Sequence, residues 1–194
     1  MVDPGFGGYY LNLANFIPVA GTRKCGSIRA AMKRYSSSPT CSPIMGFMLG
    51  TDPGVSEGYM LGLSGATAYQ IALKKGTPAS GLDPNSAQVL RLATDSHTTV
   101  GDSALGWFHL RLDVLVNPHG EVVLNCYENI LGNVTAPTWT AIDGMTQFID
   151  DSMGILTLTP PHVTGFYAFF GQYSNTVGAC TLWDQVEVYR QTAP

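Results

Sequence analysis

Apolar and polar residues alternate most clearly over residues 107–116. Every second residue is apolar and the residues between are mostly polar: Phe108, Leu110, Leu112, Val114 and Val116 against His109, Arg111 and Asp113. Successive side chains of a strand point to opposite faces, so this period of two predicts a half-buried strand. A Pro-Gly turn signal at 117–120 and an apolar run at 122–128 follow, and together they predict a β-hairpin.

The same pattern recurs in shorter runs along the chain. Residues 28–33 and 69–74 alternate in the same way, and further strand candidates are 9–16, 43–50, 58–63, 89–94, 139–143, 166–173 and 182–189. Turn signals rich in Gly and Pro separate many of these runs, and one short helix-like stretch lies near residues 145–153. We therefore predict an all-β fold with little helix, built as a two-sheet antiparallel jelly-roll sandwich.

Length and composition limit the organisation of the chain. A chain of 194 residues without an internal composition break fits one sandwich domain spanning residues 1–194, with residues 1–23 as an N-terminal arm or edge strand. Charged residues make up 12% of the chain, about half the usual share. A surface so poor in charge is typical of a protein that packs against other subunits, although a neutral lectin surface would look the same.

The net charge and the lack of a long apolar span argue against nucleic acid and against a membrane as partners. The net charge of −4 offers no basic footprint for nucleic acid. The chain has no apolar span long enough for a membrane, and its first residues lack the pattern of a secretory signal, so we expect synthesis in a cytoplasm. The basic residues near one predicted strand are interpreted as a solvated face: Arg23, Lys24, Arg29, Lys33 and Arg34.

The four cysteines are expected to be buried free thiols. Cys25, Cys41, Cys126 and Cys180 show no Cys-x-x-Cys spacing, and oxidation would allow three pairings. In a cytoplasm such thiols stay reduced.

The order of the segments adds a resemblance to a known fold. Strands at 58–63 and 69–75 precede WFHLRLDV at 107–114, the next strand ends in YEN at 127–129, and GFYAF at 165–169 and WDQVEVY at 183–189 close the chain. This order resembles the concanavalin A-like and laminin G-like jelly rolls, over most of the chain after Cys25. The family includes lectins, glucanases, adhesion modules and virion proteins, so the resemblance implies the fold and leaves the function open.

The glucanase option can be tested on the sequence. Laminarinase-like members place Glu-x-Asp-x-x-Glu or Glu-x-Asp-x-Glu on one strand, and the nearest match here is Asp184 to Glu187, with Leu182 where the first Glu would stand. Retaining glycosidases need two carboxyls about 5–5.5 Å apart. Residues three apart point to opposite faces of a regular strand, so we predict that the chain is not an enzyme of this type.

Other catalytic or metal motifs are missing from the sequence. The four histidines, at 97, 109, 119 and 162, have no spacing that would seat zinc, and there is no Gly-x-Ser-x-Gly or phosphate-binding loop. His109 shares the polar face of its strand with Arg111 and Asp113, where we expect a cross-strand or solvent contact. We predict no cofactor, with calcium as the open alternative.

A sugar-binding site needs exposed aromatic faces and a few fixed polar groups. The candidates are Trp139 and Tyr173 beside turn-like segments and Asn129 and Asn133 after the hairpin. The paired carboxylates Asp150 and Asp151 form a candidate calcium site. Plain alternatives remain, since Trp139 also suits a core or an interface and adjacent aspartates also cap short helices or face water.

Two hypotheses of function follow. The first is a non-enzymatic structural or decoration protein of a bacteriophage particle, in the tail, baseplate or capsid, which contacts copies of itself and other virion proteins and binds host-surface glycans. The second is a free-standing lectin-like carbohydrate-binding module. A glycoside hydrolase is the third and least favoured interpretation.

Overall fold

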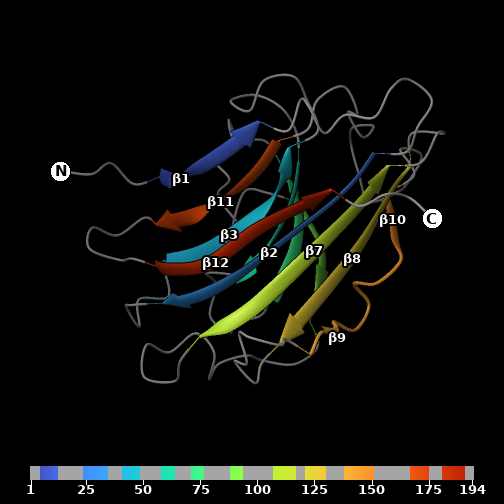
Figure 1. Ribbon diagram of the computed structural model, residues 1–194. Coiled ribbons are helices and arrows are strands. Elements are labelled where there is room, and N and C mark those ends of the chain that lie inside the picture. Colours follow the sequence, from blue (N-terminus) through green and yellow to red (C-terminus); the bar gives the residue numbers. More distant parts are fainter. Residues whose placement is uncertain are drawn as a thin grey trace.

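Two antiparallel sheets form the described part of the chain (Figure 1). The structure is a computed structural model, and it describes residues 5–12, 24–34, 41–48, 58–63, 71–76, 88–93, 107–116, 121–129, 138–150, 167–174 and 181–190. Within these ranges every regular element is a strand, and none forms a helix of the length and apolarity that a membrane crossing requires.

Sheet A has the strand order β1–β11–β3–β4–β5–β6. Its strands are β1 (Gly5–Asn12), β11 (Tyr167–Ser174), β3 (Cys41–Met48), β4 (Gly58–Leu63), β5 (Ile71–Gly76) and β6 (Gln88–Leu92).

Sheet B has the strand order β10–β8–β7–β2–β12, and a short strand, β9, also pairs with β8. Its strands are β10 (Phe148–Asp150), β8 (Val122–Asn129), β7 (Phe108–Val116), β2 (Lys24–Arg34), β12 (Thr181–Arg190) and β9 (Thr140–Ala141). These strands lie in front in Figure 1. The predicted all-β sandwich is confirmed.

Side-chain contacts show how the sheets stack. Phe170 of β11 meets Trp183 of β12 edge to face at 5.4 Å between ring centroids. At the other side, the guanidinium of Arg91 on β6 lies 4.9 Å from the ring centre of Phe148 on β10. Between these edges β2 packs on β3 and β7 packs on β4. The strands therefore stack roughly in pairs, and β1 lies beyond β11 at the edge of sheet A (Figure 1).

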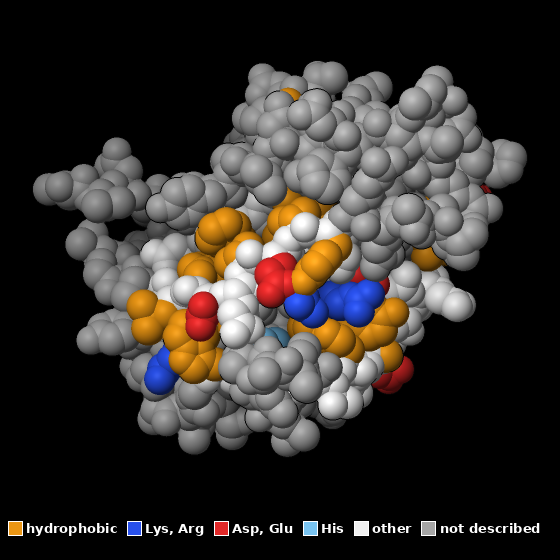
Figure 2. Space-filling model, in the orientation of Figure 1, with side chains coloured by type: hydrophobic (Ala, Val, Ile, Leu, Met, Phe, Trp, Pro, Cys, Tyr) orange, Lys and Arg blue, Asp and Glu red, His pale blue; other side chains and the backbone are white. Residues whose placement is uncertain are grey.

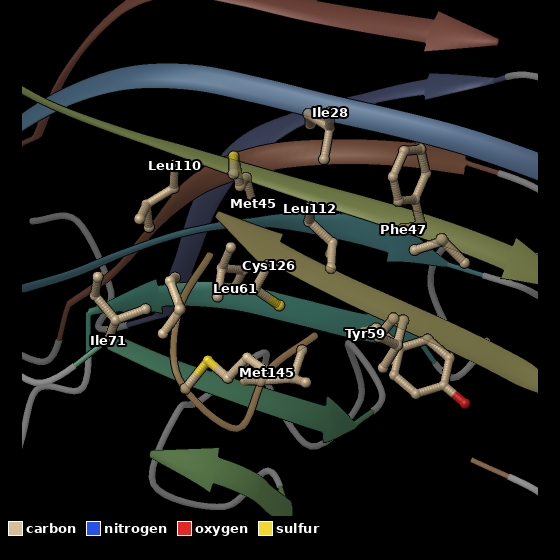
Figure 3. Close-up of a cluster of buried hydrophobic side chains, with 14 of the residues drawn as sticks. Ile28, Met45, Phe47, Tyr59, Leu61, Ile71, Leu110, Leu112, Cys126 and Met145 are labelled. Atoms are coloured by element: carbon tan, nitrogen blue, oxygen red, sulfur yellow. The ribbon is translucent and has the colours of Figure 1, made fainter. Parts of the chain in front are cut away.

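The core lies between the sheets and follows the predicted alternation. Leu110, Leu112 and Val114 of β7 are buried, as the pattern of residues 107–116 requires. Figure 3 shows Leu110 and Leu112 with side chains from both sheets, among them Ile28, Met45, Phe47, Tyr59 and Leu61. Burying one such side chain contributes about 1.5–3 kcal/mol, so this cluster is the main source of stability.

The outer face of sheet A also carries buried apolar side chains. Ile44, Met60 and Phe169 form a second cluster, and Tyr167 packs against it. Gly46 and Gly62 lie on the same face, where a Cβ atom would fall 1.9 Å from the carbonyl oxygen of Tyr59 and 2.1 Å from that of Pro43. Glycine is required at both positions because β3 and β4 approach so closely.

Most predicted strands match observed ones. The hairpin prediction is confirmed by β7 and β8, which pair with Val116 opposite Val122; its turn at 117–120 lies outside the described residues. The strand expected at 9–16 is β1, which begins at Gly5, and the one expected at 139–143 is the two-residue β9. The alternation of the sequence thus placed the strands well and their ends less well.

The helix-like stretch near residues 145–153 is a correction. Residues 148–150 form β10, which pairs with β8 and buries Phe148 and Asp150. Gly144 and Gln147 take positive φ angles of 69° and 53°, which a right-handed helix does not allow. Pairing with β8 therefore overrides the local helical pattern; residues 151–153 lie outside the described ranges.

Candidate binding site on the outer face of sheet B

The outer face of sheet B presents three cross-strand rows of side chains over β12, β2, β7 and β8. Residues directly opposite each other in antiparallel strands point to the same face. The alternate positions of these strands that do not enter the core therefore line up across the sheet. The rows are Asp184–Ala31–His109–Asn129, Glu187–Arg29–Arg111–Tyr127 and Tyr189–Ser27–Asp113–Asn125.

A β-bulge in β12 puts both of its carboxylates on this face. Asp184 stands opposite Ala31 and Glu187 opposite Arg29, with a register shift between them. Gln185 in the bulge has a φ of 49°. The bulge places one extra residue of β12 between Asp184 and Glu187, so residues three apart in the sequence point to the same face of the sheet. The expectation that Asp184 and Glu187 point to opposite faces was therefore wrong, because β12 is not a regular strand there.

Two arginines stand directly opposite each other in the middle row. Like charges in this position repel, and each arginine has its own carboxylate. Arg29 donates from Nε and Nη2 to Glu187 Oε2 at 2.9 and 2.5 Å. Arg111 donates from Nε and Nη2 to the two oxygens of Asp113 at 2.8 and 2.6 Å. These hydrogen bonds to Asp113 raise the pKa of Arg111 above its ordinary value.

An aromatic ring holds each guanidinium from a second side. The guanidinium carbon of Arg29 lies 4.9 Å from the ring centre of Tyr189, and that of Arg111 lies 5.0 Å from the ring centre of Tyr127. Cation–π contacts of this kind contribute about 0.5–1 kcal/mol at exposed sites. Carboxylate and ring together fix the orientation of both side chains.

A pocket of about 180 Å³ opens between these residues, lined by Ser27, Arg29, Arg111 and Tyr189. A cavity of about 150 Å³ holds a benzene ring, so this pocket admits one six-membered ring. Figure 2 shows the same face, where basic and acidic side chains gather next to apolar ones. The pocket thus combines guanidinium donors, a hydroxyl and an aromatic ring, which is a donor set for a polar, oxygen-rich ligand.

His109 is buried in the row next to the pocket. Its exposed fraction is 4%, so of the two expected alternatives the solvent contact is wrong; across the strands it stands opposite Ala31 and Asn129. Its Nε2 makes no hydrogen bond with the residues that the structure describes. Burial lowers the pKa of His109 below 6.5, while the charge of Asp184 acts in the opposite direction and that of Arg29 in the same one. We therefore assign a neutral imidazole to this position.

The predicted glycan-binding residues lie in different places. Asn129 is buried at the end of β8, and half-buried Trp139 directly precedes β9. The β8–β9 ladder ends with Glu128 opposite Thr140, one residue before it would reach Asn129 and Trp139. Tyr173 lies on sheet A, paired with Phe6 and Ser42, and Asn133 lies outside the described ranges. The structure brings Trp139 and Asn129 to one end of sheet B and leaves Tyr173 on the other sheet.

The candidate calcium residue Asp150 has partners within the protein. Its Oδ2 accepts hydrogen bonds from the Tyr59 hydroxyl at 2.5 Å and from Lys75 Nζ at 2.8 Å, and it is 3% exposed. Asp151 lies outside the described residues. Among the residues that the structure does describe, no three His, Cys, Asp or Glu side chains gather as metal ligands. The calcium site stays a prediction.

Sequence reasoning missed the residues that form the pocket. Arg29 was interpreted as part of a solvated face, but it is half-buried and paired with Glu187. The alternation already placed Arg29 and Arg111 on the polar faces of their strands. What it lacked was the register, which depends on which strands pair and cannot be obtained from local pattern.

No protein-family model and no curated protein sequence matches this chain. Among solved structures, the metal-free carbohydrate recognition domain of Emp46p matches with a TM-score of 0.52 and 10% identity, over 96% of this chain and 78% of that one. Human galectin-16 matches with a TM-score of 0.41 and 10% identity, over 98% of this chain and 100% of that one. The CBM2 module of the evolved Dit of Lactobacillus casei BL23 phage J-1 matches with a TM-score of 0.39 and 12% identity, over 82% of this chain and 59% of that one. The likeness to the Emp46p domain is one of fold, and it supports the concanavalin A-like jelly roll expected from the sequence.

Proposed function

We propose that this chain is a non-enzymatic carbohydrate-binding protein and that it binds sugar on the outer face of sheet B. The observation that carries the proposal is the pocket between Arg29, Arg111, Ser27 and Tyr189. Sugar rings offer hydroxyl oxygens to donors at their edges and C–H groups to aromatic rings at their faces. Tyr189 is 42% exposed and supplies the ring, while the arginines supply the donors.

The fold of the Emp46p carbohydrate recognition domain agrees with this proposal. A jelly roll is used for many functions, so this agreement is an analogy and the pocket remains the main support.

The residues of β12 support binding rather than hydrolysis. Leu182 lies where a laminarinase-like strand would carry its first carboxylate, and Glu187 is held by Arg29. Both hydrogen bonds from Arg29 end on Oε2 of Glu187, whereas a glycosidase carboxylate must reach the sugar to act on it. Asp184 is then the carboxylate of β12 without such an ion pair in the described structure.

The test is a glycan array followed by calorimetric titration of each glycan that binds. We expect Tyr189→Ala to weaken binding at least tenfold because the ring face is lost. Ile149→Ala, which removes another exposed side chain of sheet B away from the pocket, is the matched control and should bind as the unchanged protein does. Absence of binding to every glycan would refute the proposal, and so would cleavage of a bound glycan that disappears in Asp184→Asn.

A second candidate function is that of a subunit in a larger assembly, as the virion hypothesis requires. Edge strand β6 carries Val89 and Leu92, each 44% exposed, on the outer face of sheet A. Exposed apolar side chains on an edge strand favour association with another chain, and a second copy of this chain is the proposed occupant. Light scattering should then show an oligomer that dissociates in Val89→Lys/Leu92→Lys; a monomer at high concentration would contradict this function.

A further inference from the structure

The hydrogen bonds of Arg29 and Arg111 leave matching parts of the two guanidiniums open. Each arginine uses Nε and Nη2 toward its carboxylate. Within the described structure, Nη1 of neither arginine makes a hydrogen bond, and both residues line the pocket. A guanidinium is a donor at every nitrogen and accepts nothing. The pocket is therefore lined by two residues that each keep an unused donor group, and a ligand group that meets these donors must be an acceptor.

The two arginines are also held in place before any ligand arrives. Residues directly opposite in antiparallel strands have Cβ atoms about 4.5–5.5 Å apart, and Arg29 stands opposite Arg111. Their side chains are 32% and 28% exposed, and each is fixed by a carboxylate and a tyrosine ring. Little conformational entropy remains to be lost when they bind a ligand.

A pair of cations this close has an electrostatic cost that an anion relieves. Glu187 and Asp113 each satisfy one edge of their arginine: Glu187 stands beyond Arg29 on β12, and Asp113 stands opposite Ser27 in the next row of β7. An anionic group between the two Nη1 atoms would interact with both positive charges at once. Guanidinium groups bind carboxylate and other oxyanions through short, charge-assisted hydrogen bonds.

We infer that the pocket is specific for an acidic saccharide, one whose sugar ring carries a carboxylate or a sulfate group. The anionic group would lie between Arg29 and Arg111, near the Ser27 hydroxyl, and the ring would lie against Tyr189. This inference rests on the proposed function, and it adds the chemical class of the ligand.

The experiment compares matched ligands by isothermal titration. The ligands are a galacturonic acid trisaccharide, its methyl ester, the neutral galactose trisaccharide and a sulfated galactose trisaccharide. We expect the acidic ligands to bind at least tenfold more tightly than the neutral ones, with an affinity that falls as salt is raised, because partly exposed charges are screened. Preference for the carboxylate or for the sulfate would identify which anion the pocket prefers.

Two variants test the role of the arginines. Arg29→Met should reduce binding of the acidic ligand about tenfold or more, since hydrogen bonds to charged groups are among the stronger ones, and should reduce binding of the neutral ligand by a clearly smaller factor. Arg111→Met would leave buried Asp113 unpaired, so Arg111→Met/Asp113→Asn is used instead. Arg91→Met, on β6 of the other sheet, is the matched control and should behave as the unchanged protein.

The outcomes separate this inference from the proposed function. Equal binding of neutral and acidic ligands, with loss in Tyr189→Ala, would overturn the inference and keep the carbohydrate-binding function. Binding of the acidic ligand that is unchanged in Arg29→Met and in the double variant would also overturn it. Absence of binding to every saccharide would overturn both.

Discussion

Lys75 of β5 and Asp150 of β10 form a buried ion pair between the two sheets, with Nζ and Oδ2 2.8 Å apart. The side chains are 4% and 1% exposed. The Tyr59 hydroxyl, from β4, donates to the same carboxylate oxygen. Two strands of sheet A are thus joined to an edge strand of sheet B by polar contacts within an otherwise apolar layer.

Breaking this pair should strongly destabilise the fold. Lys75→Met removes the Lys75 ammonium from a buried carboxylate, and we expect a loss of about 3–5 kcal/mol in the free energy of unfolding. Lys75→Met/Asp150→Leu removes both charges and should recover most of that loss. Urea denaturation measures both. The control is Asp143→Asn, which changes an exposed carboxylate of the same region and should alter the free energy of unfolding by no more than about 0.5 kcal/mol. An equally small effect of Lys75→Met would show that the pair is not buried in solution.

The stability of the protein should depend on pH through His109. Burial lowers its pKa in the folded state below 6.5, so the unfolded chain takes up a proton at a higher pH than the folded chain does. The contribution is fully present above about pH 6.5 and is lost as the pH falls from there toward the folded-state pKa. We expect His109→Gln to lessen the decrease in stability between pH 7.5 and 5.5. Denaturation curves at both pH values test this, and identical pH dependence in the two proteins would contradict it.

Gly46 should not tolerate a side chain. A Cβ atom there would lie 1.9 Å from the Tyr59 carbonyl oxygen and 3.0 Å from the ring of Phe169. We expect Gly46→Ala to lower the free energy of unfolding by about 3 kcal/mol, at the upper end of overpacking effects. Gly144→Ala is the comparison, because a Cβ there meets nothing within 4 Å and only the positive φ of 69° opposes it, a cost of about 1–2 kcal/mol. Thermal unfolding of both variants gives the ranking, and a reversed order would contradict the close approach of β3 and β4.

The Cys126 thiol should be inert in the folded protein. It is free, fully buried in the core, and burial raises its pKa well above the ordinary value, so almost no thiolate forms at neutral pH. We expect iodoacetamide at pH 8 to leave Cys126 unmodified in the native protein and to modify it in urea. Peptide mass spectrometry reads this site separately from the other cysteines. Rapid labelling without denaturant would show that the core opens readily.

The sequence predicted local features better than pairwise ones. The period-two pattern located β7 and β8 and the burial of Leu110, Leu112 and Val114, because one strand and one apolar layer are enough to produce it. The buried free thiol, which was expected from the spacing of the cysteines and a cytoplasmic location, is confirmed at Cys126. The facing of Arg29 and Arg111 depends on the pairing of β2 with β7, residues about 80 apart in the chain, and no local pattern carries that information.

The bulge and the buried histidine escaped prediction for related reasons. Gln185 takes a positive φ without the Gly or Asn that usually marks one, so WDQVE looked like a regular strand. His109 follows the polar half of an alternating pattern, and the pattern cannot say whether its outer neighbours leave it accessible. The helical pattern near residues 145–153 gave way to pairing of Phe148 and Asp150 with β8.

The bulge in β12 also bears on how this surface can change in evolution. Loss of one residue between Asp184 and Glu187 would return β12 to a regular strand in which the two carboxylates stand two residues apart, and residues two apart point to the same face. Glu187 would then still stand opposite Arg29 on the outer face. A deletion of three nucleotides at this point could therefore remove the bulge while the carboxylate that orients Arg29 is kept, which makes the bulge a place where related proteins can differ in length without a change in the charge of the binding face.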